Sequence, residues 1–237
     1  MNDKEPKIRT QHWTIDQLSI NHHLIDYPSL RQHQANDDAE LVRLHFGLQG
    51  HYRFHYQQLD CSFALVGHHN NLMYSQGMNL AVENQSLLLE TFGIHFQPDF
   101  FIHIAQNGND PLKRFVEKVD KKEAALFSPY WRPNPFALQQ VIQEMIHCPF
   151  VLPLKNLFLL SKSIELLVLQ AQLYEATPPK PILKSSADRK KLLEARALLL
   201  QNIEDPPTLH ELAKRIQLNE YQLKKGFKAL FGLSVFG

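Results

Sequence analysis

The hydrophobic pattern of this chain changes its period near residue 97, which predicts strands before that point and helices after it. In "LVRLHFGLQG", positions 42, 44, 46 and 48 are apolar and alternate with polar or small residues, which is the period of a half-buried strand. The segments "HYRFHY", "CSFALVG", "NLAVEN" and "LLLETFGIHF" follow, separated by turns containing Gly, Asn or His. Many short strands at this spacing predict an antiparallel β-barrel or sandwich. Residues 1–37 are polar without a clear period, and "WTIDQLSI" is expected to form one strand.

Helical spacing dominates from Pro98, a residue that suits the first turn of a helix. Further helices are expected over 109–127, 134–148 and 153–175. The last of these is apolar on most sides. Its predicted stripe consists of Leu157, Leu160, Ile164, Leu167, Val168 and Ala171, and Leu159, Leu166 and Leu169 widen that stripe. Such a helix must be covered, and two alternatives stay open: packing between the sheet and a C-terminal module, or the seam of a homodimer.

The composition is that of an ordinary globular protein, with 44% hydrophobic and 21% charged residues. The chain has no run of about 18 apolar residues and no secretory signal at its start, so we expect no membrane segment and a cytoplasmic location. Cys61 and Cys148 lie far apart, which favours free thiols in a reducing compartment. From Lys180 onward, 11 Lys and Arg face 6 Asp and Glu, whereas the rest of the chain is mildly acidic. This asymmetry indicates that only the C-terminal segment meets a polyanion, and a solvated lysine-rich helix face is the alternative.

A proline-rich stretch, "ATPPKPILKSS", predicts a semi-rigid linker. The expected regions are a β domain at 1–110, a helical region for packing or dimerisation at 111–176, the linker at 177–187 and a helical module at 188–237. The predicted fold class is therefore α+β.

Two short capped helices joined by a tight turn are expected in the C-terminal module. Thr208 and Glu211 fit a capping box at the start of one helix, and Asn219 and Gln222 repeat that spacing at the start of the next. Gly232 fits the left-handed cap that ends the second helix. Helices of this length joined by "QLN" have the spacing of a helix-turn-helix.

The second of these helices, 220–230, has two opposite faces at about 100° per residue. Its inner stripe consists of Leu223, Phe227 and Leu230. Its outer face carries Tyr221, Lys224, Lys225 and Lys228. A helix that enters a DNA groove needs long donors for base edges or phosphates, together with an aromatic or apolar contact, and the outer face supplies both.

The stretch "TLHELAKRIQLNEYQLKKGFKALFGLS" resembles the first helix-turn-helix of the AraC family of bacterial transcription regulators. The similarity lies in the small Ala213, the apolar turn residue Leu218, and "LKKGFKALFGLS", which resembles the family's leucine–basic–x–phenylalanine–lysine run ending in glycine. Such regulators commonly carry a cupin-like β-barrel sensor followed by helices and a linker, and the order of elements in this chain agrees. The turn and second helix are most similar to the branch that includes siderophore-responsive regulators.

The resemblance implies that Tyr221, Lys224 and Lys225 approach DNA bases, and that Lys228 and Gln222 lie at phosphates or flanking edges. Two features depart from the family pattern. The sequence has Gln217 at a turn position often held by glycine, and it contains only the first of the family's two helix-turn-helices. We therefore expect the sequence to be either a piece of a longer regulator or a naturally truncated one, and the chain by itself to bind DNA weakly or not at all at physiological salt.

Several of the thirteen histidines lie in the β region, which raises the alternative of a metal-binding cupin. His51 and His55 share a strand face but lie about 13 Å apart in a regular strand, while His68 and His69 point to opposite faces. We therefore expect no metal ligands, no cofactor and no catalytic residues. The candidate residues for lining a ligand site are His45, Tyr52, Phe54, Tyr56, Phe92 and His95.

The resulting prediction is a non-enzymatic transcription regulator of the AraC type. Its cupin-like N-terminal domain is expected to sense a small-molecule effector. The sequence does not identify this effector, and a siderophore-like molecule is the candidate that the resemblance suggests. Its helix-turn-helix is expected to bind double-stranded DNA. A homodimer is left open as a further partner, and no membrane is expected. The alternative is a stand-alone cupin that binds a small molecule or a metal, with or without enzymatic activity.

Overall fold

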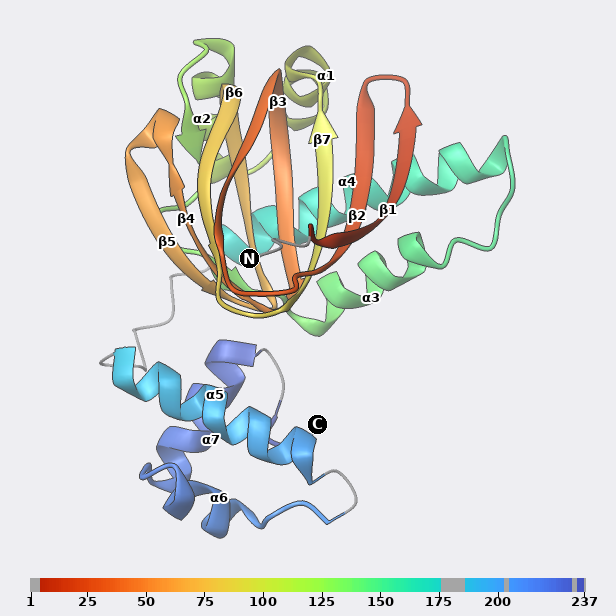
Figure 1. Ribbon diagram of the computed structural model, residues 1–237. Helices are drawn as coiled ribbons and strands as arrows, with labels where there is room; N and C mark the ends of the chain where they lie inside the picture. Colours follow the sequence, from red (N-terminus) through yellow and green to blue (C-terminus); the bar gives the residue numbers. More distant parts are fainter. Residues whose placement is uncertain (1–4, 176–185, 203–204, 232–233, 237) are drawn as a thin grey trace. The chain divides into compact units, whose positions relative to one another are not determined.

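The computed structural model describes residues 5–175, 186–202, 205–231 and 234–236. Two compact units make up the chain, Met1–Ala176 and Thr177–Gly237, which we call the N-terminal unit and the C-terminal unit. Figure 1 draws both. The predicted linker at 177–187 lies outside the described residues except for its last two positions, where a helix has already begun.

The N-terminal unit consists of strands followed by helices, as the change in hydrophobic period predicts. Its strands are β1 (Lys7–Ile15), β2 (Leu18–Asp26), β3 (Gln32–Gln49), β4 (His51–Tyr56), β5 (Cys61–Val66), β6 (His69–Asn84), β7 (Leu88–Phe96), β8 (Ala125–Leu126) and β9 (Arg132–Pro133), with a short 3-10 helix η1 (Gln57–Leu59). Its α-helices are α1 (Pro98–Ala105), α2 (Asp110–Asp120), α3 (Phe136–Ile146) and α4 (Leu154–Glu175).

One antiparallel sheet holds these strands in the order β1-β2-β7-β3-β6-β4-β5, and β8 and β9 add to β6. The long strands β3 and β6 run through a bend, marked by a register shift between Asp37 and Glu40 and by Gly77 at φ +73°. Glycine adopts this left-handed backbone without steric cost, and a Cβ on Gly77 would lie 3.3 Å from the Asp37 carbonyl oxygen. On one side of the bend β6 also pairs with β4, and on the other side β3 also pairs with β7. The sheet therefore folds back on itself, which confirms the predicted antiparallel barrel or sandwich.

Both faces of β3 beyond the bend are covered. Val42, Leu44 and Phe46 point into the main hydrophobic core, which they share with buried side chains of α1 to α4. Arg43 and His45, on the opposite face, line an internal cavity instead of facing solvent. The pattern that predicts a half-buried strand thus corresponds to a strand with an apolar face against helices and a polar face around a cavity.

The first 37 residues contain more strand than their sequence predicts. The stretch 13–20 is a hairpin and not one strand, because Asp16 takes a left-handed conformation (φ 44°) between β1 and β2. β1 lies at the edge of the sheet, and most of its side chains are exposed on both faces. An edge strand of this kind lacks the alternating pattern by which strands are recognised in a sequence.

In Figure 1, α1 and α2 lie above the sheet, α4 runs behind it, and α3 lies below α4. Pro98 occupies the first turn of α1, as predicted. The helix expected over 109–127 is shorter, because α2 ends at Asp120 and Lys122 is left-handed. Beyond it, Ala125 and Leu126 pair with β6 instead of continuing the helix.

The face of α4 that packs into the core coincides only in part with the predicted stripe. Its buried residues are Leu159, Ser163, Leu166, Leu167, Gln170, Ala171 and Tyr174. Leu157 and Val168, which the sequence places in the stripe, are 65% and 59% exposed. Because the helix is apolar on most sides, periodicity could not identify the buried face, and two of the buried positions are polar. By length and composition α4 could cross a membrane, but one side of it belongs to the core of the N-terminal unit.

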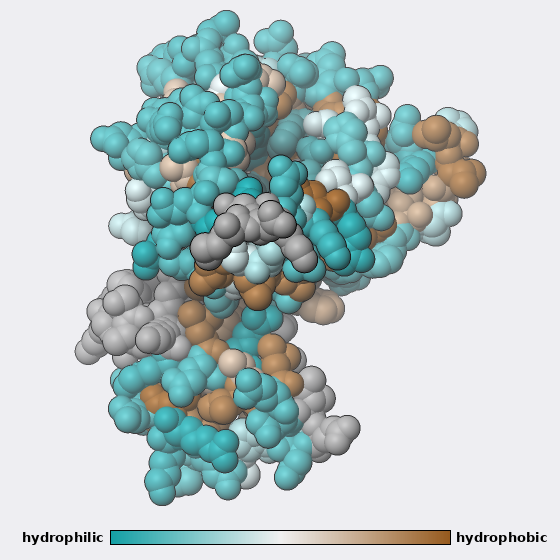
Figure 2. Space-filling model, viewed as in Figure 1, coloured by the Kyte–Doolittle hydropathy of each residue, from teal (hydrophilic) through white to brown (hydrophobic). Residues whose placement is uncertain are grey.

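An exposed apolar surface continues from α4 into the loop that precedes it. Figure 2 shows hydrophobic side chains gathered where α3 connects to α4. The exposed large apolar residues of this region are Phe150, Val151, Leu152, Leu154, Leu157, Ile164 and Val168. We call this set the α4 apolar surface.

The C-terminal unit contains three helices in its described residues: α5 (Ser186–Gln201), α6 (Leu209–Arg215) and α7 (Glu220–Phe231). The buried side chains include Leu192 and Ala195 of α5, Leu212 of α6 and Phe227 of α7, so all three helices contribute to one core. The predicted helix-turn-helix is therefore present as α6 and α7.

Candidate functional site

A cavity of about 280 Å³ lies within the folded sheet. Side chains from both sides of the bend line it, together with one tryptophan from the segment between β8 and β9. The lining residues are Asn21, His23, Ala35, Arg43, His45, Tyr52, Phe54, Met73, Met78, Leu80, Val82, Thr91, Phe92, Gly93, His95 and Trp131. The volume is near the lower end of the range for small-molecule sites, and the wall combines apolar side chains with a few polar groups, as such sites generally do.

A chain of hydrogen bonds with a fixed direction runs along one side of this cavity. His69 Nδ1 lies 2.7 Å from the Val66 carbonyl oxygen, and because a carbonyl only accepts, Nδ1 carries the proton. In a neutral His69 ring, Nε2 then accepts from the Tyr52 hydroxyl, 2.9 Å away. The hydroxyl has one proton, so it must accept from His45 Nε2, at 2.7 Å. His45 Nδ1 is left as a bare acceptor, with no hydrogen-bond partner among the described residues.

Burial keeps two histidines of the cavity uncharged near neutral pH. Desolvation, followed by the proximity of His95 and His23, lowers the pKa of His45 to about 4. Desolvation and the Arg43 guanidinium lower the pKa of His95 to about 4, against a smaller opposite effect of Asp37. The polar part of the wall therefore presents neutral imidazoles.

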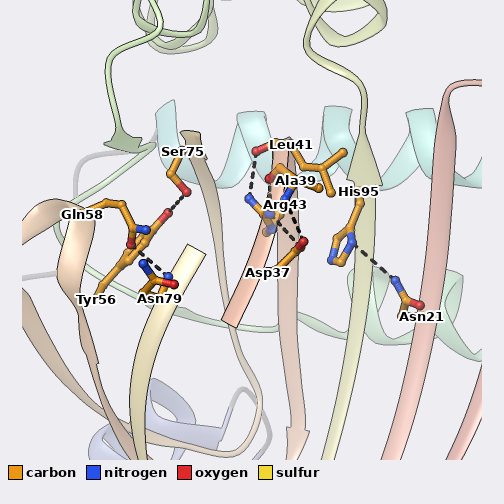
Figure 3. Close-up of polar contacts among 10 residues, drawn as sticks. All are labelled: Asn21, Asp37, Ala39, Leu41, Arg43, Tyr56, Gln58, Ser75, Asn79 and His95. Carbon is orange, nitrogen blue, oxygen red and sulfur yellow. Dashed lines mark hydrogen bonds and ion pairs between the residues drawn. The ribbon is translucent and has the colours of Figure 1, made fainter. Parts of the chain in front are cut away.

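Arg43 supports the bend and also borders the cavity. Its side chain is 2% exposed, and Figure 3 shows its guanidinium turned back along β3. One terminal nitrogen donates to the Asp37 carboxylate and to the Ala39 carbonyl, both at 2.7 Å, and the other donates to the Leu41 carbonyl at 3.2 Å. Burial by itself raises the pKa of Asp37. The hydrogen bonds from Arg43 and the Ala39 amide, together with the Arg43 charge, lower that pKa by a larger amount, so the net pKa is below its usual value. The ion pair therefore persists at neutral pH and holds the β3 bulge in place.

Aromatic side chains pack around Trp131, which lines the cavity together with His45 and Phe54. Its indole makes edge contacts with four rings, at centroid distances of 5.5 Å to His69, 5.6 Å to His45, 5.7 Å to Phe54 and 5.8 Å to Phe63. Edge-to-face packing at such distances is favourable between aromatic side chains. The cavity is thus suited to a ligand with a flat, largely apolar body.

Five of the six candidate ligand residues line this cavity: His45, Tyr52, Phe54, Phe92 and His95. Tyr56 does not line it; this residue is buried and its hydroxyl donates to Ser75 Oγ, as Figure 3 shows. Figure 3 also shows His95 of β7 directed toward Asn21 of β2, with 3.4 Å between Nδ1 and Nδ2.

Sequence reasoning missed Trp131, Arg43 and His23 as cavity residues, and it missed His69 as a hydrogen-bond partner of Tyr52. Trp131 lies far along the chain, in a segment that looks like a loop, and no local pattern connects it to the sheet. Arg43 occupies a polar position of a recognised alternation, where an exposed side chain is the ordinary expectation. His23 lies in a strand that the sequence pattern does not reveal.

Among the described residues, no group of three or more His, Cys, Asp and Glu side chains is arranged to hold a metal ion. His51 and His55 face Val66 and Ser62 across the β4–β5 pair, and His55 Nδ1 lies 3.0 Å from Ser62 Oγ.

Two capping boxes fix the ends of the helix-turn-helix, as predicted. The Thr208 side chain accepts from the Glu211 amide, and the Glu211 carboxylate accepts from the Thr208 amide. In the second box, Asn219 Oδ1 accepts from the Gln222 amide at 2.7 Å, and Gln222 Oε1 accepts from the Asn219 amide at 3.2 Å. These bonds satisfy amides that a helix start leaves without partners.

The turn between α6 and α7 places a non-glycine residue in the left-handed region, since Gln217 has φ 54°. The Lys191 ammonium of α5 donates to the Gln217 carbonyl at 3.1 Å. The strain expected for this position is therefore present, and a contact from another helix helps to hold the turn.

All five candidate DNA-binding residues are exposed on α7: Tyr221, Gln222, Lys224, Lys225 and Lys228. The Lys225 ammonium lies 4.8 Å from the centre of the Tyr221 ring, a distance typical of a cation–π contact. Leu223 and Phe227, on the opposite face, are buried. Side-chain positions of Leu230 lie outside the described part of the structure.

Comparison with known proteins places these features in context. Residues 14–186 match the family described as the regulatory protein PchR N-terminal domain. Over 107 residues the chain is 34% identical to the regulatory protein PchR of Pseudomonas aeruginosa, a match that covers 44% of this chain and 36% of PchR. The match thus spans little more than a third of that curated relative.

Two solved structures match over most of this chain. The AraC-like transcriptional activator CuxR has 8% identity and a TM-score of 0.47, with 94% of this chain and 74% of CuxR covered. Unsaturated fatty acid bound ToxT from Vibrio cholerae has 8% identity and a TM-score of 0.44, with 95% of each chain covered.

Proposed function

Because this chain belongs to the regulatory protein PchR N-terminal domain family, we propose that it is a transcription regulator of the AraC type. In this proposal the N-terminal unit senses a small-molecule effector and the C-terminal unit binds double-stranded DNA. Neither unit is assigned a catalytic role, and the place of action is the bacterial cytoplasm, where the DNA is.

The exposed face of α7 is the observation that carries this proposal. Its Tyr221 side chain is 65% exposed, and three lysines extend from the same helix. Lysine ammonium groups contact phosphates and base edges, and an exposed aromatic ring can pack on sugars or thymine methyl groups. Two capping boxes and a shared core hold this face rigid, so few side-chain contacts need to be ordered on binding.

A charge-removal experiment tests DNA binding. At about 50 mM salt, the triple variant Lys224→Gln, Lys225→Gln, Lys228→Gln should bind a fluorescent mixed-sequence duplex at least tenfold more weakly, as measured by anisotropy. Because each phosphate contact contributes about 0.9 to the salt slope, the slope of log K against log salt should fall in magnitude by about 2 to 3. Low salt is needed because a single helix-turn-helix makes few contacts.

The matched control removes three exposed lysines of the N-terminal unit, by Lys113→Gln, Lys118→Gln and Lys121→Gln. This variant should retain the original slope. If both triple variants lose the same amount of DNA affinity, the attraction is only the general one between a basic protein and DNA. That result would contradict a binding face on α7. Such a result would favour the alternative of a ligand-binding cupin.

The proposed effector is a small molecule with a flat, ring-containing body and no net charge where it contacts the histidines. The aromatic wall around Trp131 supports the first property. The second follows from the neutral state of His45 and His95 and from the pairing of Arg43 with Asp37. The resemblance to siderophore-responsive regulators is compatible with such a ligand and identifies no particular one.

We further propose that the chain forms a homodimer through the α4 apolar surface. Exposed apolar side chains of this extent generally mark an interaction site. Leu157, Ile164 and Val168 follow one another at intervals of seven and four residues, so they form a stripe along α4. If two copies cross antiparallel about a two-fold axis near residue 162, Leu157 of one meets Val168 of the other, as an isologous interface requires.

Introducing charge into this stripe tests the dimer. The variant Ile164→Glu, Val168→Glu should shift the chain from dimer to monomer in sedimentation at micromolar concentration, because a two-fold axis places four carboxylates in one apolar interface. Gln57→Glu, an exposed change in η1 outside the α4 apolar surface, should leave the dimer intact. A wild-type chain that is monomeric at about 100 μM would rule the interface out.

A further inference from the structure

The segment 125–134, which we call the strap, connects the cavity wall to the last turn of α4. Both of its ends pair with β6, through Leu126 and Ala125 at one end and through Arg132 and Pro133 at the other. Trp131, near its second end, lines the cavity. The next residue, Arg132, contacts α4. Two consecutive residues of the strap therefore contact the cavity and α4.

Arg132 makes three kinds of contact with the end of α4. Its backbone amide donates to the Tyr174 hydroxyl at 3.3 Å, and its guanidinium donates to the Leu173 carbonyl. The guanidinium also lies over the Tyr174 ring, 4.8 Å from its centre. A backbone bond, a side-chain bond and a stacking contact together fix the relative position of strap and helix more firmly than any one of them would.

A buried polar network centred on Asn70 of β6 completes this connection. The Tyr174 hydroxyl donates to the Asn70 carbonyl, and the Asn70 amide group donates to the carbonyls of Arg132 and Pro133, each at 3.2 Å. From α4, Gln170 Nε2 donates to Asn70 Oδ1 at 3.0 Å. All these side chains are buried. Gln170 and Tyr174 each reach Asn70 through a buried hydrogen bond, and losing a buried bond carries a desolvation cost, so the strap and the last turn of α4 are expected to move together.

We infer that the strap couples occupancy of the cavity to the last turn of α4, residues 170–175. Trp131 is the side chain that meets the ligand, and the contacts of Arg132 with Tyr174 are the link. A ligand that packs against the indole shifts the position of the strap, and the hydrogen bonds of the Asn70 network shift the last turn of α4 with it. The chain continues from α4 to the C-terminal unit. The ligand-sensing part of this inference rests on the proposed function, whereas the link rests on the contacts themselves.

Hydrogen exchange in cavity variants of the full chain tests the link. Trp131→Leu should increase the exchange rates of the backbone amides of 170–175 at least tenfold, while amides at 159–163 of the same helix stay unchanged. The control is Met78→Ala, which removes apolar volume from the cavity wall at a position of β6 away from the strap. Its amides at 170–175 should exchange at the wild-type rate. Trp131→Phe, which retains a ring, should give an intermediate rate and serves if the leucine variant fails to fold.

The reverse direction is tested in a Trp13→Phe background, in which Trp131 is the only tryptophan. Because coupling is reciprocal, Tyr174→Phe should change the acrylamide quenching constant of Trp131 at least twofold, whereas the exposed change Gln172→Ala should not. The inference is overturned if Trp131→Leu and Trp131→Phe leave 170–175 unaffected, if Met78→Ala has an equal effect, or if Tyr174→Phe leaves the quenching unchanged. Neither measurement involves DNA or an effector, so its result is separate from that of the DNA-binding test.

Discussion

Replacing Phe227 with alanine is expected to unfold most of the C-terminal unit while the N-terminal unit stays folded. The Phe227 side chain is 5% exposed, and its ring centre lies 4.5 Å from that of Phe231. Removing a buried phenylalanine costs about 3–5 kcal/mol, and a unit of this size has a total stability of roughly 3–9 kcal/mol. The substitution therefore removes a large part of the free energy of unfolding.

Two optical signals separate the units in this experiment. Both tryptophans, Trp13 and Trp131, lie in the N-terminal unit, so tryptophan fluorescence reports on that unit alone. Circular dichroism at 222 nm reports on helices in both units. Phe227→Ala should lower the helical signal and leave the fluorescence transition in place, whereas Tyr221→Ala, on the exposed face of α7, should change neither. A helical signal equal to that of the wild type would refute the proposed core.

Lowering the pH from 7.5 to 5.0 is expected to destabilise the N-terminal unit by about 4 kcal/mol through His45 and His95. The pKa of each is about 4 in the folded chain, against 6.5 for an unperturbed histidine. Between these values the unfolded chain binds protons that the folded chain does not, so stability falls as the pH falls from 6.5 toward 4. Each ring contributes on the order of 2 kcal/mol over the measured interval.

Urea unfolding followed by tryptophan fluorescence at the two pH values measures this change. His95→Gln, which replaces the ring with a neutral polar side chain, should remove about half of the pH dependence. Asp37 serves as an internal reference, because its lowered pKa makes its pairing with Arg43 contribute stability that is lost only at more acidic pH. Identical stability of the wild-type chain at pH 7.5 and 5.0 would show that the two imidazoles are not buried in the neutral form.

The helix-turn-helix could be predicted almost residue by residue because its signals are local. A capping box joins positions three residues apart, and a buried stripe repeats every three to four residues, so both can be found within a few turns of sequence. The observed α6 and α7 begin immediately after Thr208 and Asn219, as their capping patterns require.

The cavity could be predicted only in part, because its wall is assembled from distant segments. The alternation in β3 identifies which side chains share a face, but not whether that face meets solvent or a cavity. Trp131 reaches the cavity only because its strap pairs with β6, about sixty residues earlier in the chain. For the same reason the buried face of α4 could be predicted only in part. The core also includes Gln170, whose hydrogen bond to Asn70 of β6 joins positions a hundred residues apart.

If the cavity holds the proposed ligand, the hydrogen-bond chain through Tyr52 would let it discriminate between ligands of the same shape. His45 Nδ1 is an acceptor as long as the Tyr52 proton points to His69 and the His69 proton points to Val66. A ligand hydroxyl or amide proton completes the row without disturbing it. A ligand that presents only a lone pair to His45 Nδ1 requires a change of tautomer or protonation state in the His45–Tyr52–His69 chain. Without that change, two acceptors face each other, at a cost of about 1–3 kcal/mol. Two molecules of equal size and flatness are thus told apart by the placement of one hydrogen atom.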